Sequence, residues 1–373
     1  MSAFRLTDEQ LECGSMVREF CNKRIHPVTR KLDEEGMPDE FLKELADLGY
    51  LGASIPSEYG GMGLDIFSMA CMIEEFARAN GGVATLVAAH LSLGCKTVEI
   101  YANDELKTKY LPRMAVGGVT SFCLTEPNAG TDVFAITAKA DTDNKFYILN
   151  GQKQFITSAD IAKFYVIFCK TEKGPTAFLV ERNAEGLSVG PPEKKLGIRA
   201  SKTCSVHLQD VKVPAENIVG EMGKGLRIAL SVLDYGRIGV AAGALGMAEQ
   251  ALAEAIEYAK NRVQFGKAIS SFQTTQFKFA DMKTEIDACR FLLYNALSIC
   301  AEGKRFSVEA AEAKLKASEV ACWVADENIQ IHGGYGYTQD YNAERLWRDA
   351  RITRIYEGTS EAMRMVIGGS IGR

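Results

Sequence analysis

Two kinds of residue cluster, those that hold metal ions and those that build disulfide frameworks, are missing from this sequence. The ten cysteines include no CxxC pair, and the four histidines lie far apart with no ligand spacing. We therefore expect no metal site. Because no secretory signal is evident, we interpret the scattered cysteines as reduced thiols, several of them packed in the core. The histidines are His26, His90, His207 and His332.

The sequence also lacks a long apolar run and a block of charges of one sign. No apolar stretch reaches the ~18 residues expected of a membrane span, so we predict no span. The formal charge of −5 comes from 43 basic and 48 acidic residues, which argues against nucleic acid as the main partner. The first residues lack a basic segment followed by an apolar one, so we expect a cytoplasmic protein. A transit peptide already removed would leave no trace.

The chain has 373 residues, and 47% of them are hydrophobic. This is enough for a large core and for two or three domains. The residue pattern changes twice along the chain. We therefore predict an N-terminal helical domain over residues 1–115, a middle antiparallel β-domain over 116–221 and a C-terminal helical bundle over 222–373.

Local signals support the first, helical block. The TDEQ at residues 7–10 has the pattern of a capping box. Pro38 opens a helix that Gly49 ends. Two further helices are predicted over residues 69–79 and 83–93, where apolar residues dominate.

The second and third blocks differ in their periodicity. Short β-branched and aromatic runs between residues 117 and 220 predict strands, and Asn150-Gly151 predicts a hairpin turn. Apolar residues at spacings of three and four then predict long helices over 223–260, 274–302 and 307–332. These helices are long enough to form a bundle.

The most informative motif is RIYEGTSE at residues 354–361. Its carboxylate, Glu357, stands between an aromatic residue and a glycine that allows close approach. A carboxylate shielded from water has a raised pKa and is a usable base near neutral pH. Such a base suits removal of a proton from carbon next to a carbonyl. The structural alternative is an ordinary ion pair between Glu357 and one of the nearby arginines.

Four other motifs accompany this octapeptide, and together they resemble the acyl-CoA dehydrogenases over essentially the full length. The resemblance implies the fold predicted above, with a C-terminal four-helix bundle, a homotetramer built as a dimer of dimers, and FAD between the β-domain and the bundle. In order, the motifs are LTEPNAGTD at 124–132, NGQKQFIT at 150–157, NRVQFGK at 261–267 and QIHGGYG at 330–336.

The resemblance also implies binding residues. It assigns the flavin to a first group and the diphosphate and adenine to a second group reached across a subunit interface. A third group is assigned to the acyl-CoA substrate. The flavin group is Phe122, Leu124, Thr125, Phe155, Thr157, Thr359 and Glu361; the second is Arg262, Gln264, Phe265, Gln273, Gln330, Gly333 and Gly334; the third is Thr131, Leu233, Asp234, Arg237, Tyr356 and Gly358.

Simpler interpretations exist for several of these residues. Thr131 also fits a capped turn, Phe155 an inward strand residue, and the GG pair a helix end. Asp234 and Arg237 are three residues apart on a predicted helix, so they also fit an ion pair within that helix.

The resemblance implies α,β-dehydrogenation of an acyl-CoA to the 2-enoyl-CoA. Glu357 would remove the α-proton, a hydride would pass to flavin N5, and an electron-transferring flavoprotein would reoxidise the cofactor. The isovaleryl branch of the family places its base at the position that is Gly236 here. Glycine cannot serve as a base, so Glu357 is the candidate.

The acyl group is less defined. The LDYGRIG stretch at 233–239 is most similar to the short-chain branch, although that branch often has glutamine where this chain has Gly243. Tyr235 would narrow the cavity if it points inward. The position matching the arginine of the glutaryl branch is Ala84, which disfavours a dicarboxylic acyl chain. Linear, branched and alicyclic acyl groups stay open.

Rival functions belong to other classes. An acyl-CoA oxidase would pass electrons to oxygen, a nitroalkane oxidase would use an aspartate base, and a flavin-binding interaction protein would have lost its chemistry. Rapid reoxidation in air would identify an oxidase, and a purified protein unable to take up FAD would identify a protein without flavin chemistry.

Overall fold

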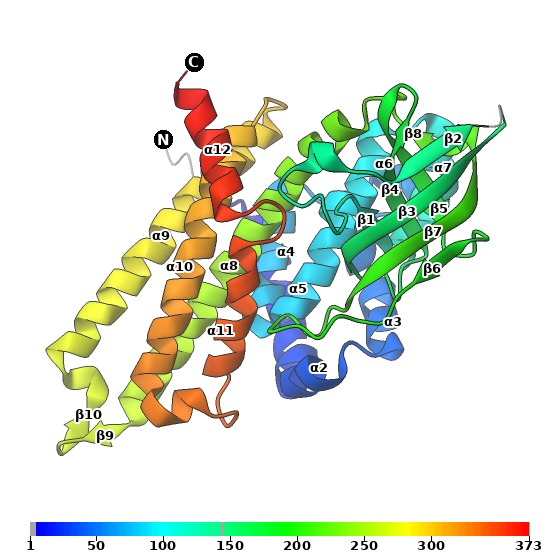
Figure 1. Cartoon of the computed structure of the whole chain (residues 1–373). Helices are drawn as coiled ribbons and strands as arrows, with labels where there is room; N and C mark the ends of the chain where they lie inside the picture. Colours follow the sequence, from blue (N-terminus) through cyan, green and yellow to red (C-terminus); the bar gives the residue numbers. More distant parts are fainter. Residues whose placement is uncertain (1–4, 143–144, 373) are drawn as a thin grey trace.

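The computed structural model describes residues 5–142 and 145–372. Its elements run from helices to strands and back to helices (Figure 1). The change to strands falls between Ala115 and Thr120, and the return to helix falls between Val219 and Gly225. This order of elements follows the predicted three blocks.

The N-terminal helices begin with a capping box, as predicted. The Thr7 side chain accepts from the backbone of Gln10, and the Gln10 side chain accepts from the backbone of Thr7. The predicted helix after Pro38 is α3, and Gly49 follows it in the left-handed conformation. The helices are α1 Asp8–Phe20, α2 Thr29–Glu35, α3 Asp39–Asp47, α4 Ile66–Ala79, α5 Gly81–Ala88, α6 Lys96–Tyr101 and α7 Asp104–Ala115, with π-helical η1 Cys21–Ile25 and η5 Ala89–Cys95.

The middle block is an eight-stranded sheet in which most neighbouring strands are antiparallel. Two pairs are parallel, β1 with β4 and β2 with β4, so the predicted antiparallel domain is not antiparallel throughout. The strands are β1 Thr120–Cys123, β2 Lys139–Thr142, β3 Phe146–Thr157, β4 Phe164–Thr171, β5 Gly174–Glu181, β6 Leu187–Val189, β7 Thr203–Pro214 and β8 Ile218–Val219.

The predicted hairpin turn at Asn150-Gly151 is wrong. Both residues lie inside β3, where the pairing with β7 shifts register between Leu149 and Gly151. Gly151 has φ +144°, and a β-carbon added there would lie 2.7 Å from that of Ala138. The glycine therefore serves a bulge and a close approach of backbones, which the same dipeptide permits as readily as a turn.

The C-terminal block contains the three predicted long helices and two shorter ones. They are α8 Gly225–Asn261, α9 Gln273–Ala301, α10 Ser307–His332, α11 Ala343–Arg351 and α12 Ser360–Ile371. A small hairpin, β9 Val263–Gln264 with β10 Lys267–Ala268, joins α8 to α9. Short 3-10 turns complete the chain at His26–Val28, Tyr50–Gly52, Ser57–Tyr59, Val133–Ala135, Ala215–Asn217, Ile269–Ser271, Gly333–Tyr337 and Ile352–Arg354.

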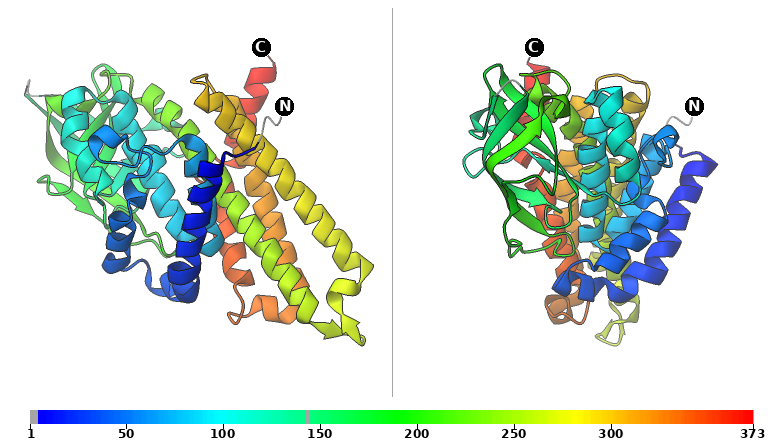
Figure 2. Two further views of the ribbon diagram at one scale, coloured as in Figure 1. Left: turned by 180° about the vertical axis from the view of Figure 1, so that it is seen from behind. Right: turned by 90° about the vertical axis from the view of Figure 1, so that its right-hand side faces the viewer.

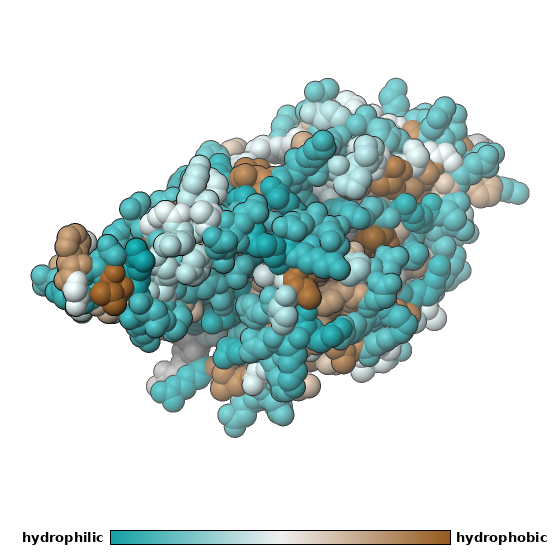
Figure 3. Space-filling view, turned by 90° about the horizontal axis from the view of Figure 1, so that it is seen from below, coloured by the Kyte–Doolittle hydropathy of each residue, from teal (hydrophilic) through white to brown (hydrophobic). Residues whose placement is uncertain are grey.

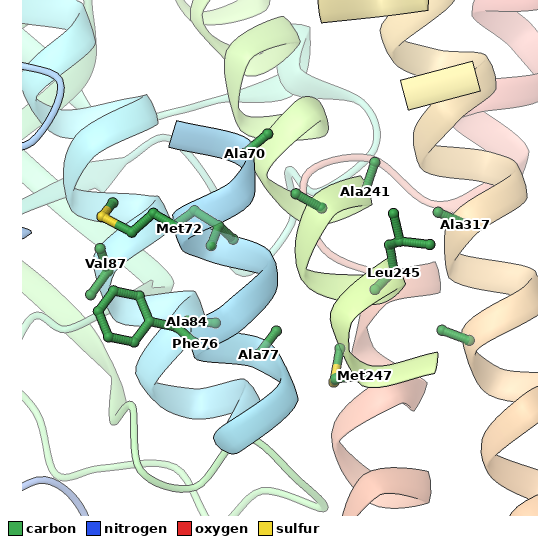
Figure 4. Close-up of a cluster of buried hydrophobic side chains, with 14 of the residues drawn as sticks. Ala70, Met72, Phe76, Ala77, Ala84, Val87, Ala241, Leu245, Met247 and Ala317 are labelled. Carbon is green, nitrogen blue, oxygen red and sulfur yellow. The ribbon is translucent and has the colours of Figure 1, made fainter. Parts of the chain in front are cut away.

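The helices α4 and α5 lie between the sheet and the long C-terminal helices, as the views from front and back agree (Figures 1 and 2). One core spans this junction, and small residues of α4 and α5 face α8 there (Figure 4). Leu245 of α8 and Ala317 of α10 belong to the same core. Close packing of these helices fixes the position of everything attached to them.

Two helical stretches, residues 81–101 and 225–261, are long and apolar enough to cross a membrane. The share of the apolar window that is buried inside the protein is 61% for the first and 78% for the second. The pattern therefore fits core helices, which meet the same criterion of length and composition. Among the described residues, no group of three or more histidines, cysteines or carboxylates could hold a metal ion.

Candidate active site

The loop between α11 and α12 carries Glu357 to the boundary between the bundle and the β-domain (Figure 1). Glu357 has φ +53° and Gly358 has φ +99°. A left-handed conformation is uncommon for glutamate, and such strain collects at functional sites. Thr359 then caps α12 by accepting from the backbone of Ala362 at 3.2 Å. The loop is thus a sharp bend between two helices, with the carboxylate at its turning point.

The Glu357 side chain points inward against α8. Its Oε2 is fully shielded and has no hydrogen-bond partner among the described residues. A β-carbon added at Gly236 would lie 1.9 Å from that oxygen and 2.7 Å from Leu93 Cδ2. Burial raises the pKa of Glu357 to about 7, against the opposing positive charges of Lys314 and Arg237. A carboxylate with these properties is a base that works near neutral pH.

Contacts connect this carboxylate to the first strand of the β-domain. Leu93 of η5, which flanks Gly236, packs in a small apolar cluster with Val232 of α8. Phe122 of β1 and Leu233 of α8 pack against the same cluster. The structure therefore brings Phe122 and Leu233, predicted from separate motifs, to one place beside the base.

Five of the seven residues predicted for the flavin lie along the neighbouring ends of β1 and β3, and the other two, Thr359 and Glu361, lie at the start of α12. Thr125 accepts from the Gln154 backbone at 2.9 Å, and the Ser121 hydroxyl donates to the Thr157 carbonyl at 2.7 Å. Phe155 sits at a second register shift in β3, has φ +58° and is 64% exposed. It is therefore not an inward strand residue. A bulge turns an aromatic face outward here, which suits the flat ring of a flavin.

A buried ion pair that the sequence analysis missed holds this edge. Lys153 is fully buried, and its Nζ lies 2.7 Å from Glu126 Oε1 and 3.3 Å from the Leu124 carbonyl. Glu126 also accepts from the backbone amides of Thr137 and Ala138. The pair fixes the loop that carries Leu124 and Thr125. Its only sequence signal was a lysine in a strand with an apolar face.

Two of the three substrate residues predicted on α8, Asp234 and Arg237, form an ion pair within the helix. Arg237 Nη1 lies 2.6 Å from Asp234 Oδ1, both side chains are largely buried, and the Ser307 hydroxyl donates to Asp234. Arg237 points toward the base loop, because a β-carbon added at Gly358 would lie 3.9 Å from its Nη2. Tyr356 is partly buried, Thr131 is exposed in the turn after β1, and Glu361 is in the first turn of α12.

A cavity of about 540 Å³ lies beside the β9–β10 hairpin, at the end of the bundle far from the sheet (Figure 1). Arg262 and Gln264 meet Gly333 and Gly334 there, although the two motifs are about 70 residues apart. The guanidinium of Arg262 lies over the Tyr335 ring at 5.7 Å. A guanidinium beside accessible backbone amides is suited to phosphate oxygens. Three more residues, Phe265, Gln273 and Gln330, were predicted for the same site. All three are exposed, and none is among the described residues that line this cavity.

Comparison with known proteins decides the family. Residues 7–118, 121–211 and 223–372 match, respectively, the acyl-CoA dehydrogenase N-terminal, middle and C-terminal domains. The chain belongs to the acyl-CoA dehydrogenases. It is an oxidoreductase and a flavoprotein with FAD as cofactor, and the outward aromatic at Phe155 and the Arg262 cavity both fit that cofactor.

Three relatives illustrate the match. "Acyl-CoA dehydrogenase, short-chain specific" from Megasphaera elsdenii is 45% identical, over 99% of this chain and 100% of the relative. A structure of "Acyl-CoA Dehydrogenase complexed with FAD" from Bacillus anthracis is 34% identical with a TM-score of 0.94, over 99% of this chain and 67% of that one. A structure described as "Electron transferring flavoprotein of Acidaminococcus fermentans" is 43% identical with a TM-score of 0.97, over 99% of both chains.

Proposed function

We propose that this enzyme removes the α-proton of a short-chain acyl-CoA with Glu357 as its base, and so forms the 2-enoyl-CoA. The single observation that carries the proposal is the Glu357 Oε2, which is shielded and unpartnered among the described residues. Bound FAD supplies the acceptor for the hydride that leaves the β-carbon. The protein's own part is to hold the carboxylate dry, deprotonated and aimed at one carbon.

The chemistry requires the negative charge that grows on the thioester oxygen to be stabilised. Backbone N–H groups in a water-excluded site do this most effectively. The strained bend at Glu357 and Gly358 leaves the backbone of the loop beside the carboxylate. We propose that the Glu357 N–H donates to the thioester carbonyl while the side chain takes the proton.

A cavity of about 90 Å³ between α4, η5 and α8 supports a short acyl chain. Gly239 and Ser92 line it, one turn along α8 from Gly236 and one residue along η5 from Leu93. Tyr235 also lines this cavity, so in this proposal the tyrosine narrows the space for the acyl chain. The volume is below the ~150 Å³ of a cavity that holds benzene. The short-chain specificity of the Megasphaera elsdenii relative agrees with this size.

We also propose that FAD is shared between two copies of the chain in a homotetramer. Figure 1 places β9 and β10 at the end of the bundle far from the sheet, so Arg262 is remote from the flavin residues of its own chain. The hairpin carries Val263 and Phe265, 55% and 94% exposed, and apolar atoms stand out at this end in Figure 3. Such exposed apolar groups suit a second copy. An electron-transferring flavoprotein is the proposed acceptor, and the cytoplasmic location stays a prediction.

The test is anaerobic mixing of butyryl-CoA with the purified enzyme and with Glu357→Gln. The wild-type flavin should bleach, and the variant should keep its yellow colour and its substrate binding. Full bleaching of the variant would overturn the proposal. A panel of linear, branched and cyclic acyl-CoAs then identifies the acyl group, and rapid reoxidation of the wild type in air would favour an oxidase.

A further inference from the structure

The base loop is tied to the bundle by a lysine that is entirely buried. Lys314 lies in the middle of α10, and no part of its side chain is exposed. Its Nζ donates to the carbonyl oxygen of Gly358 at 2.5 Å. Gly358 directly follows Glu357, so one hydrogen bond joins the core of the bundle to the residue next to the base.

A buried ammonium is costly, and its stem fits only where its neighbours are small. Ala310 and Ala317, one turn before and after Lys314, are small buried residues on the same helix. Replacing the lysine by an apolar residue would often be neutral or stabilising if its charge had no role. Packing alone therefore does not explain a charged residue at this position.

The charges around Glu357 indicate what the ammonium group of Lys314 does. Arg237 on α8 is the other cation that acts on Glu357, but Asp234 pairs with it at 2.6 Å. Lys314 has no ion pair of this kind among the described residues, and it is the cation that acts most strongly on Glu357. The other titratable groups that face the pair are Cys322 of α10, Tyr356 of the loop and Glu361 of α12.

We infer that Lys314 is a positioning residue for the base: it fixes the strained loop through the Gly358 carbonyl and favours the deprotonated carboxylate of Glu357. This inference rests on the proposed function of Glu357. Burial lowers the pKa of Lys314 to about 8, and the Glu357 charge opposes that lowering. The sign agrees, because a positive charge near a buried carboxylate brings the pKa of that carboxylate down toward the working pH.

Three substitutions separate the charge from the hydrogen bond. Lys314→Met removes both, Lys314→Gln retains an uncharged donor for the Gly358 carbonyl, and Lys314→Arg retains the charge. The measurement is the rate of flavin reduction by butyryl-CoA between pH 5.5 and 9. In the wild type the rate should rise through the pKa of Glu357 and then level off.

We expect the acidic limb of that profile to move up by about one pH unit or more in Lys314→Met and Lys314→Gln. The limb should return to within about half a unit of wild type in Lys314→Arg, as the charge would require. The maximal rate should fall further in Lys314→Met than in Lys314→Gln, because only the methionine leaves the loop carbonyl without a donor. An acidic limb that stays in place in both neutral variants would overturn the inference.

Lys195→Met is the matched control. Lys195 is a partly buried lysine, it donates to the Ser201 carbonyl, and burial lowers its pKa to about 8 as well. Its loss should cost stability but leave the acidic limb unchanged. If the limb moved equally in Lys195→Met, the effect would be a general consequence of losing a buried cation, and the inference would fail.

A second readout does not depend on turnover. The infrared band of a protonated carboxyl group that is present in wild type and absent from Glu357→Gln reports the titration of Glu357 directly. It should persist to higher pH in Lys314→Gln than in wild type, and an unchanged titration would contradict the inference. If substrate still bleached the flavin of Glu357→Gln, the proposed function itself would fail. If Glu357→Gln lost bleaching but the acidic limb stayed in place in the Lys314 variants, only the role of Lys314 would be rejected.

Discussion

Glu357 Oε2 and Gly236 are packed so closely that a β-carbon added at the glycine would lie 1.9 Å from the oxygen. The absence of a side chain on α8 is thus the condition for the base to occupy its place. A carboxylate at position 236 and one at position 357 would compete for the same space. The glycine that the sequence analysis set aside as unable to act is a structural requirement of the residue that does act.

Gly236→Ala should therefore displace the carboxylate. We expect substrate-dependent flavin reduction to slow by about 100-fold, since a misplacement of about 1 Å has effects of that size. Gly243→Ala is the matched control on the same helix, because its β-carbon would meet Ile73 at 3.8 Å and Ala77 at 3.9 Å, both ordinary contacts. Single-turnover kinetics compare the two. Equal rates in Gly236→Ala and wild type would contradict the packing described here.

The raised pKa of Glu357 should also be visible in the stability of the protein. The pKa is about 7 in the folded state and 4.5 as the ordinary value, so the folded state binds the proton more tightly. Its contribution is present below pH 4.5 and is lost as pH rises through 7. Glu357→Gln has no titrating group at this position. Its free energy of unfolding should therefore rise relative to wild type by up to about 3 kcal/mol between pH 4.5 and pH 8.

Urea unfolding at several pH values measures that difference. The free energy of unfolding of wild type should fall relative to Glu357→Gln as pH rises, and the difference should level off above pH 8. A difference independent of pH would show that Glu357 titrates normally. The dry environment proposed for the base would then be wrong.

Lys153→Met should loosen the edge of the flavin site. It leaves Glu126 charged and buried without its cation, which typically costs about 3–5 kcal/mol. We expect a lower urea midpoint and less FAD per chain after gel filtration. The control is Lys163→Met, because Lys163 is exposed and its loss should stay within about 0.5 kcal/mol. Equal stability of the two variants would show that the ion pair of Lys153 with Glu126 does not stabilise the edge of the flavin site.

Arg262→Ala should weaken FAD retention, because it leaves phosphate charge without a partner. Lys260→Ala, two residues earlier and exposed, controls for the loss of one positive charge at this end of α8. FAD content after dilution and gel filtration measures retention. Equal FAD content in both variants and the wild type would exclude the cavity at Arg262 as a diphosphate site.

Much of the fold could be predicted because its signals are local. The capping box at Thr7 and the long helices α8 to α10 follow from spacings within a few residues. The hairpin turn predicted at Asn150-Gly151 was wrong because the dipeptide permits both a turn and a bulge. Only the strands on either side of β3, which pair along it on both edges, select the bulge.

In the candidate site too, local motifs could be predicted from the sequence and long-range contacts could not. Glu357 and the flavin residues lie in motifs that can be identified from the sequence. Lys314 lies 44 residues before the carbonyl it binds, and no local pattern connects the two. Its one signal was its place on the apolar stripe of α10 between Ala310 and Ala317. A lysine at a core position predicts a buried partner but not which partner.

Exchange of the α-hydrogen tests the role of Glu357 most directly, because it isolates proton removal from hydride transfer. An acyl-CoA analogue with sulfur in place of the β-carbon keeps its acidic α-hydrogens and has no β-hydride to give. In D₂O at pH 8, the wild-type enzyme should exchange an α-hydrogen of this analogue for deuterium, and Glu357→Gln should bind the analogue without exchanging it. Exchange by Glu357→Gln at the wild-type rate would contradict the assignment of Glu357 as the base.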